Sequence, residues 1–179
     1  MDTQQQQEQQ EDSIKDLQGT EAKKKIKDMA EAVKSCFFVT NITTGQPLST
    51  RPMSPQKVDD DGIFWFLSNK ESHKNMDLKT DPNVQLLFQG SAYSDFLSIY
   101  GTATLTEDKS IIKELWDPTL KTWFTEGVDD PRISVIKVEP LEGYYWDTKN
   151  GAAVALVKRL AGAIVGKTID DSVEGTISV

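Results

Sequence analysis

The chain has 179 residues, of which 37% are hydrophobic and 27% are charged. This composition is typical of one globular domain with a hydrophobic core rather than of a disordered chain. Its 28 acidic residues outnumber the 20 basic ones, and the net charge of −8 excludes nucleic acid as the main partner, because phosphate backbones require a basic surface. The single cysteine, Cys36, cannot form an internal disulfide, and no cysteine–histidine spacing predicts zinc.

The ends of the chain differ in composition from its middle. Residues 1–12 are mostly Gln, Glu and Asp, which predicts a disordered tail ahead of a single domain over residues 13–179. The start of the chain shows no apolar stretch of the signal-peptide type. The apolar stretch at 152–166 is interrupted by Lys158 and Arg159 and is too short for a membrane span. We therefore expect a cytoplasmic protein with no membrane partner.

An N-terminal helix is predicted first. Apolar residues such as Ile26, Met29 and Val33 recur at helical spacing with Lys and Glu between them, which indicates an amphipathic helix of about three turns ending near Lys34. After it the pattern changes to β-branched and aromatic runs separated by turns. Strands are expected over 36–40, 48–53, 63–67, 84–89, 96–105, 133–138 and 143–146.

Short helices are expected between and after the strands. One covers 71–79 and is stopped by Asp81-Pro82, and another opens with Thr106 as its N-cap and closes at Trp116-Asp117-Pro118. A last short helix is expected over 152–163, followed by a loop-like C-terminal tail. Six or seven short antiparallel strands are best buried in a closed or nearly closed barrel, so the predicted fold is mainly β, a β-barrel with short helices.

The first candidate binding segment is Thr50-Arg51-Pro52-Met53. An arginine in an apolar β segment is costly unless it meets an anion, and its guanidinium fork suits a phosphate. Pro52 lacks a backbone donor and therefore favours a sheet edge. The local sequence by itself favours the alternative, an exposed arginine in a bend.

The second candidate is the junction that runs from Trp65-Phe66-Leu67 through Ser68 to Lys74. A buried strand ends here and a short helix begins, and the free N–H groups of a helix N-terminus favour a phosphate. Ser68 supplies a hydroxyl, and Lys74 can reach back as a point charge. The alternative is an N-cap serine followed by a solvated lysine.

The remaining candidates are aromatic residues and one histidine. Trp116 and Trp123 flank a loop rather than a periodic face, which is typical of an interface or a planar ligand site and equally of a lid over the core. His73 is the only histidine, and no nucleophile or carboxylate is placed beside it, so we expect it to be exposed or structural.

The order of several short motifs resembles one known family, the general stress protein 26 branch of the pyridoxamine 5′-phosphate oxidase-like flavoproteins. The resemblance runs from about Met29 to Trp146, and the ordered series is more specific than any single motif. The motifs are Arg51-Pro52-Met53, Asp61-Gly62, Trp65-Phe66-Leu67-Ser68, Lys74, Asp81-Pro82-Asn83-Val84, Gly101-Thr102-Ala103, Glu114-Leu115-Trp116, Trp123-Phe124, Asp129-Asp130-Pro131 and Tyr145-Trp146.

The resemblance implies an FMN-binding split β-barrel that forms a homodimer, with flavin sites at the subunit interface and FAD as the alternative flavin. It implies that Arg51, Ser68 and Lys74 hold the FMN phosphate. The backbone of Thr50 to Met53 and of Trp65 to Leu67 would line the ring and the ribityl chain. Gln89 and the loop from Trp116 to Trp123 would come from the partner subunit or close the site.

The resemblance leaves three functions open. The first is a stress-related flavin-binding protein, and the second is an FMN-dependent oxidoreductase with a nicotinamide donor and an unknown small substrate. The third is a binding module of the same fold that prefers haem or another flavin-like cofactor. Pyridoxamine 5′-phosphate oxidases themselves carry an Arg-x-His pair near the C-terminus, and no histidine follows His73 here, which argues against vitamin B6 oxidation.

Overall fold

A computed structural model describes residues 13–43, 45, 47–91, 95–148 and 172–179. The predicted N-terminal tail and the predicted helix over 152–163 lie outside these described residues. The predicted N-terminal helix is confirmed as α2, Gly19–Val33. Its apolar stripe is buried against the sheet, and it ends at Lys34, which adopts a left-handed conformation and donates its N–H to the carbonyl of Ala30.

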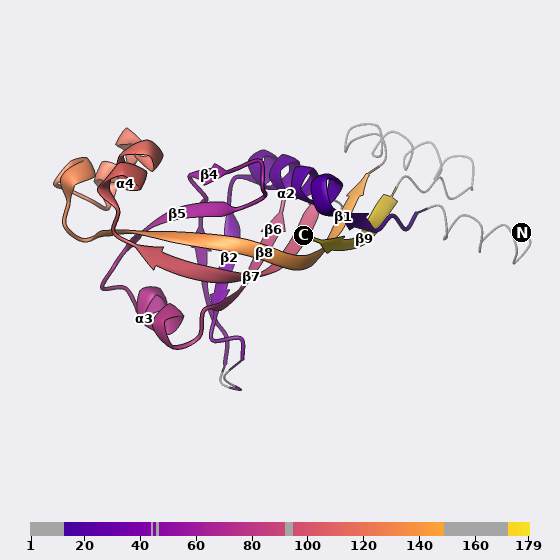
Figure 1. The fold of residues 1–179 in the computed structure, drawn as a ribbon, viewed down its shortest axis with the longest axis horizontal. Coiled ribbons are helices and arrows are strands. Elements are labelled where there is room, and N and C mark those ends of the chain that lie inside the picture. Colours follow the sequence, from indigo (N-terminus) through magenta and orange to yellow (C-terminus); the bar gives the residue numbers. More distant parts are fainter. Residues whose placement is uncertain (1–12, 44, 46, 92–94, 149–171) are drawn as a thin grey trace, which may run out of the picture.

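The described part of the chain is mainly β (Figure 1). The strands are β1 (Leu17–Gln18), β2 (Cys36–Thr40), β3 (Ser49–Met53), β4 (Lys57–Val58), β5 (Phe64–Asn69), β6 (Asn83–Gln89), β7 (Phe96–Thr106), β8 (Ile133–Thr148) and β9 (Ser172–Ser178). The other helices are α3 (His73–Thr80), α4 (Lys109–Leu115) and the two short 3₁₀ helices η1 (Pro118–Thr122) and η2 (Gly127–Asp129).

The strands form one curved sheet that branches and does not close. Its main order is β1-β9-β8-β7-β6-β2-β3, and β5 pairs with β8 on one side and β4 on the other. Every pairing is antiparallel except the parallel pairing of β1 with β9. The mainly β barrel-like fold is therefore confirmed, although the described residues form nine strands rather than six or seven.

The long strand β8 replaces two predicted strands. The expected break between them, around Pro140, is a β-bulge inside one strand: Tyr100 pairs with Glu142 and Gly101 with Pro140, so Leu141 is the extra residue. A proline fits at such a bulge because the ladder is already interrupted there. Gly101 is required opposite it, since a Cβ would lie 2.5 Å from the carbonyl oxygen of Glu139. One strand can thus pair with β5, β7 and β9 along its length.

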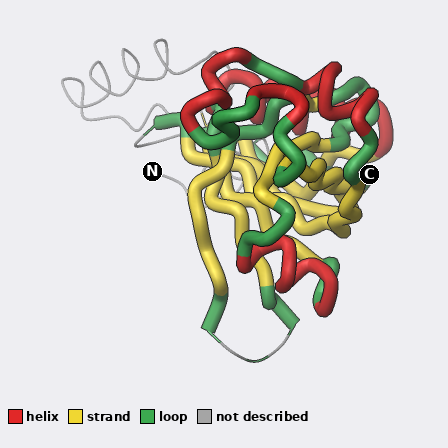
Figure 2. Tube along the Cα trace, turned by 90° about the vertical axis from the view of Figure 1, so that its left-hand side faces the viewer, coloured by secondary structure: helices red, strands yellow, loops and turns green. Residues whose placement is uncertain are grey.

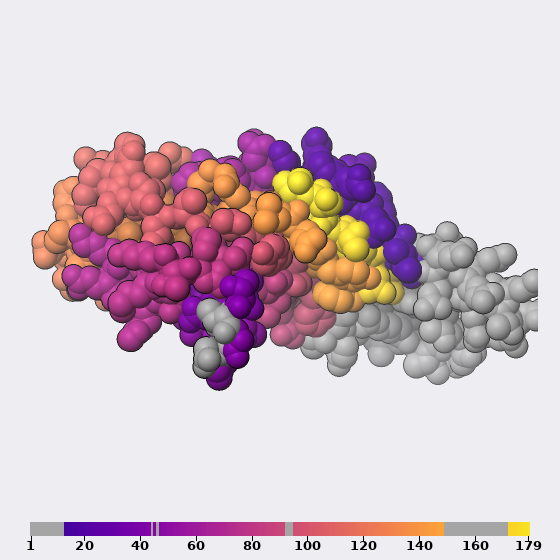
Figure 3. Space-filling view, turned by 60° about the horizontal axis from the view of Figure 1, so that its bottom comes forward, coloured from indigo at the N-terminus to yellow at the C-terminus, as the bar shows by residue number. Residues whose placement is uncertain are grey.

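Two further predictions are wrong. The end of the C-terminal tail is not a loop but the strand β9, in which Gly175 and Ile177 face inward and which lies beside the N-terminal segment (Figure 3). The N-cap of α4 is Asp108, whose carboxylate accepts the N–H of Ser110, whereas the Thr106 hydroxyl accepts the N–H of Asp108. Asp108 takes the N-cap position because β7 continues through Thr106 before the helix begins.

Two apolar clusters lie on opposite faces of the β5/β8 pair. The main core joins α2 to the inward residues of the sheet, including Phe64 and Phe66. Side chains alternate between the two faces of a strand, so Leu67, which follows Phe66 in β5, points to the opposite face. There it packs in a second cluster under α4, η1 and η2. In Figure 1, α2 lies above the strands and α3 below them, Figure 2 agrees, and both helices contribute side chains to the main core. Helix α3 therefore covers the end of the main core that α2 leaves open.

Candidate functional site

Helix α3 joins two parts of the sheet that do not pair with each other in the described residues. β3 ends the main strand order, and β5 belongs to the branch. From α3, Asn75 contacts the β5/β8 pair, Asp77 contacts β2 and β3, and Leu78 is buried in the main core. The helix thus spans the split between the two edges.

Arg51 points from β3 toward α3. It pairs with Phe38 of β2, which is fully buried, so its side chain leaves the sheet on the inner face. Its Nη1 donates to the Thr40 hydroxyl at 2.8 Å, and its Nη2 lies 3.4 Å from the Asp77 carboxylate. Thr40 in turn donates to Asp77 at 2.6 Å. The exposed bend that the sequence left open as an alternative is therefore excluded.

Lys74 adds a second cation to this end of the helix. Partial burial, and secondly the positive charge of Arg51, lower the pKa of the Lys74 ammonium. Lys74 makes no ion pair with any described residue. Partial burial acts to raise the pKa of Asp77, but hydrogen bonds from Thr40 and Asn41 and the charge of Arg51 hold it below its ordinary value. Arg51 and Lys74 bring two positive charges, and the nearby carboxylate of Asp77 is already bonded to Thr40 and Arg51. This end of α3 is therefore electropositive, which suits an anion.

Ser68 lies at the same end of the core but turns inward. Its hydroxyl donates to Asn75 Oδ1 at 2.7 Å, and Asn75 Nδ2 donates to the Ser134 hydroxyl at 2.7 Å. Ser134 also donates to the carbonyl of Ser68 at 3.2 Å. All three side chains are buried. This network fixes α3 on the β5/β8 pair, and the predicted contact of Ser68 with a phosphate stays a prediction.

The two segments predicted to line a flat ring both border the split. Beyond β2, no described strand pairs with β3, which holds Thr50 to Met53. β4 reaches only Phe64 and Trp65 of β5, so the backbone beyond them has no described strand partner on that side. The backbone N–H and C=O groups along these two open edges are therefore available to hydrogen-bond a ligand.

The side chains in these segments are mostly engaged in packing. Phe66 lies in the main core with its ring 5.2 Å from that of Phe38, and Trp65 donates its indole N–H to Asp59 at 3.0 Å. Leu67 packs in the second cluster, and Met53 packs against the main core. Pro52 is exposed on the outer face of β3.

The other predicted residues do not join Arg51. Gln89 is exposed at the end of β6. Trp116 packs in the second cluster, whereas Trp123, at the end of η1, is 66% exposed. His73 is exposed as the first residue of α3, as expected. Within this one chain, the tryptophan loop and the cation pair are separate features.

The sequence did not reveal the residues that orient the predicted site residues. Asp77 lies one helical turn after Lys74, a spacing that places both on neighbouring faces of α3. Thr40 faces the same side of the β2/β3 hairpin as Arg51, and the hairpin register could have indicated it. Asn75 had no comparable signal, since its partner Ser134 is distant in sequence.

The described residues contain no group of three or more metal-ligating side chains, and none of their helices is long and apolar enough to cross a membrane. What remains is an electropositive end of α3 beside two open strand edges. Comparison with known proteins identifies the family: the sequence profile described as pyridoxamine 5′-phosphate oxidase like matches residues 21–170. The chain belongs to this family. The predicted resemblance is confirmed.

Individual relatives agree with this assignment. Protein bli-3 of Neurospora crassa is 31% identical over 156 residues, covering 80% of this chain and 74% of that protein. A solved structure assigned as a candidate general stress protein 26 of Jannaschia sp. CCS1 has a TM-score of 0.73 at 25% identity, covering 90% of this chain and all of that one. A general stress FMN/FAD binding protein of Xanthomonas citri has the same fold, with a TM-score of 0.56 at 22% identity over 66% of this chain and 82% of its own.

Proposed function

We propose that this chain binds FMN, with its phosphate at Arg51 and Lys74 and its ring along the open edges of β3 and β5. The observation that carries the proposal is the convergence of these two cations at the end of α3 in a chain of this family. The Xanthomonas citri protein of the same fold, described as binding FMN or FAD, supports a flavin as the ligand.

The chemistry of the cations favours a phosphate. Arg51 is held by Thr40 and Asp77, so its fork is oriented before a ligand arrives. Lys74 is partly desolvated and repelled by Arg51, and a dianionic phosphate beside both would remove that repulsion. Ser68 would add a hydroxyl only by exchanging its bond with Asn75.

The open strand edges suit the ring of a flavin. Backbone N–H and C=O groups along Thr50 to Met53 and beyond Trp65 can bond to the polar edge of the isoalloxazine. The flavin itself supplies any redox chemistry, and the protein supplies binding and orientation.

We further propose that a second copy of the chain completes the site. An outer stripe of apolar residues crosses the neighbouring strands β3, β2 and β6: Pro52 pairs with Phe37, and Phe37 with Leu87. Phe37 is 53% and Leu87 40% exposed. Contiguous exposed apolar residues of this kind mark interaction surfaces. A partner covering the outer stripe would also cover Thr50 and Pro52 and bring its Gln89 or tryptophan loop near the flavin.

We propose flavin binding in a stress-related, cytoplasmic role rather than vitamin B6 oxidation, because the Arg-x-His pair is absent and the relatives carry stress-protein names. Turnover with a nicotinamide donor is the alternative that the same site allows. Anaerobic mixing of the flavin-loaded protein with NADH or NADPH separates the two: rapid bleaching supports the oxidoreductase, and a flavin that stays oxidised supports the binding protein.

The deciding measurement is the visible spectrum of the purified protein before and after adding FMN. We expect saturable binding with perturbed flavin bands. A Soret band, or no change on adding FMN, would refute the proposal.

The dimer has its own test, sedimentation of the FMN-loaded protein at micromolar concentration. We expect Phe37→Glu in the outer stripe to give a monomer and to weaken FMN binding. Leu141→Glu, at the exposed bulge of β8, is the matched control and should remain dimeric. A monomeric unmodified protein with FMN bound would refute the shared site.

A further inference from the structure

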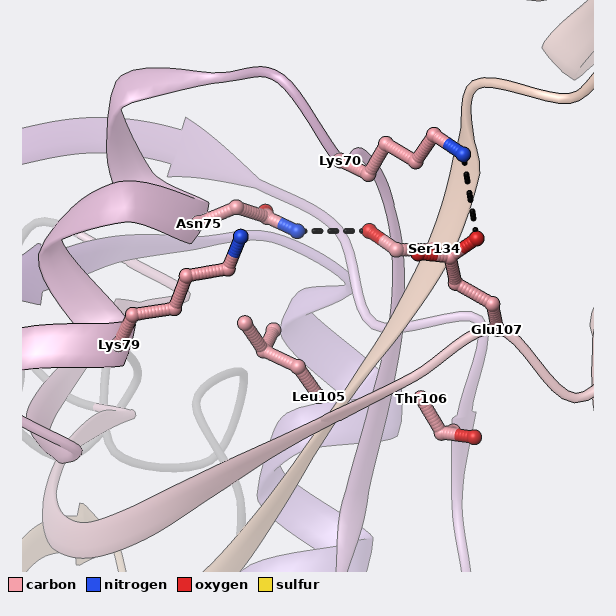
Figure 4. Close-up of a pocket in the computed structure, with 7 residues that line it drawn as sticks. All are labelled: Lys70, Asn75, Lys79, Leu105, Thr106, Glu107 and Ser134. Atoms are coloured by element: carbon pink, nitrogen blue, oxygen red, sulfur yellow. Dashed lines mark hydrogen bonds and ion pairs between the residues drawn. The ribbon is translucent and has the colours of Figure 1, made fainter.

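A pocket of about 300 Å³ lies beside α3, between this helix and the strands β7 and β8 (Figure 4). None of the residues predicted to hold the flavin lines it. Its floor is formed by Asn75 and Ser134, its wall by Leu105, and its rim by Lys70 and Lys79. Asn75 and Lys79 come from consecutive turns of α3 and face the pocket, whereas Asp77 between them faces β2 and β3.

The rim carries one uncompensated positive charge. Lys70 is paired with Glu107, whose carboxylate lies 3.1 Å from its ammonium nitrogen. Lys79 has no hydrogen bond or ion pair with any described side chain, and Figure 4 shows its ammonium group directed toward Asn75. The two lysines and one glutamate therefore leave the pocket with a net charge of one, which a monoanion would neutralise.

The floor is polar, buried and fixed in place. Asn75 is 1% and Ser134 2% exposed. Asn75 Oδ1 accepts from two serine hydroxyls, and Nδ2 donates to Ser134, so the amide cannot rotate without breaking this network. An amide nitrogen carries two hydrogens, and within the described residues the Nδ2 of Asn75 has one acceptor. This amide nitrogen and the Lys79 ammonium are therefore two donors among the residues that line one pocket.

The size and walls of the pocket restrict the ligand further. Its volume lies at the lower end of small-molecule sites, so a compact body fits and a nucleotide does not. Leu105 and the aliphatic stems of the lysines offer apolar contact on the sides. A small inorganic ion would not contact these apolar walls, so they favour an organic anion.

We propose that this pocket binds a compact organic monoanion, with its charged group at Lys79 and Asn75 and its apolar body against Leu105. The site is independent of the flavin proposal, because it uses neither Arg51 nor Lys74. It is nevertheless linked to them, since Asn75 also holds Ser68 and shares α3 with Lys74.

Benzoate is the probe, followed by amide chemical shifts in ¹H–¹⁵N spectra of the full chain. We expect saturable shifts around Asn75, Lys79 and Ser134, with a dissociation constant on the order of 1 mM. Benzyl alcohol, which has the same ring without the charge, and acetate, which has the charge without the ring, should each bind more weakly. Equal binding of benzyl alcohol would overturn the proposal, as would the absence of saturation.

Substitutions of single lysine residues test where benzoate binds. Lys79→Ala should weaken benzoate binding about fivefold, the effect of losing one exposed charge-assisted hydrogen bond, and Lys79→Arg should restore it. Lys113→Ala, in the last turn of α4, makes the same charge change elsewhere and should have no effect. Lys74→Ala should also leave benzoate binding unchanged. A loss with Lys74→Ala but not with Lys79→Ala would assign the probe to the flavin phosphate site and refute this one.

Discussion

Replacement of Arg51 by alanine separates ligand binding from folding. In the free protein the guanidinium makes a 2.8 Å hydrogen bond to Thr40 and a long 3.4 Å contact with Asp77. Asp77 keeps its 2.6 Å bond from Thr40 when the arginine is removed. We therefore expect the free energy of unfolding to fall by only about 1 kcal/mol or less, as for other partly exposed pairs.

The expected loss in FMN binding is larger. A charge-assisted hydrogen bond to the phosphate contributes about 1.5–3 kcal/mol, which corresponds to a dissociation constant raised about 10- to 150-fold. Arg51→Lys should lie between, because a lysine keeps the charge but loses the fork. Riboflavin, which lacks the phosphate, should bind the variant and the unmodified protein alike.

The assay is titration of FMN and of riboflavin by quenching of flavin fluorescence, at constant ionic strength. Lys24→Ala on α2 is the matched control, because it removes one exposed positive charge from an ion pair remote from α3. An unchanged FMN constant in Arg51→Ala, or an equal loss for riboflavin, would show that Arg51 does not bind the phosphate.

Three further predictions concern buried polar groups. Asn75→Ala leaves the buried hydroxyls of Ser68 and Ser134 without their partner. The free energy of unfolding, measured in urea, should therefore fall by about 2–4 kcal/mol. A negligible change would mean that water replaces the amide. Burial raises the pKa of the Cys36 thiol to about 12, so at pH 8 iodoacetamide should modify the native protein far more slowly than the urea-unfolded chain, and equal rates would contradict this burial. A hydrogen bond from Arg132 holds the pKa of Asp130 well below its ordinary 3.8. Its stabilising effect is therefore complete above that pH and is lost as pH falls through the depressed value, so the stability difference from Asp130→Asn should be largest at neutral pH and shrink in acid. A difference that stays constant throughout acid denaturation would refute the role of this charge.

The elements that local pattern defines were predictable from the sequence. Helix α2 and strand β2 coincide with the predicted segments, because their apolar periods are long and end at clear boundaries. Strand β9 was missed because its inward residues, Gly175 and Ile177, include one that carries no side chain to mark the period. Its partners β8 and β1 lie far away in the sequence, so only the assembled sheet identifies it.

The site divides in the same way. Arg51 was singled out because an arginine in an apolar strand is costly unless it meets an anion, and Lys74 because it follows a strand-to-helix junction. The structure brings the two cations close together, and their contact with a phosphate stays a prediction. Their supports were not predictable, since Asp77 and Asn75 are ordinary helix residues until the sheet places Thr40 and Ser134 opposite them. Ordered motifs indicated the candidate ligand-binding residues, whereas the residues that orient them follow from tertiary contacts.

The parallel pairing of β1 with β9 has a consequence for synthesis on the ribosome. Asp16 accepts the N–H of Thr176, a residue 160 positions later, and Lys15 bonds to Glu174. At 5–20 residues per second, the segment from Ser13 to Gln18 waits roughly 8–30 s for its partner to be translated. During that interval this segment lacks its partner strand, and the edge of β8 lacks its own for the shorter time between translation of β8 and of β9. Open edges of this kind favour association between chains. Translation of β9 therefore closes both of these open edges at once.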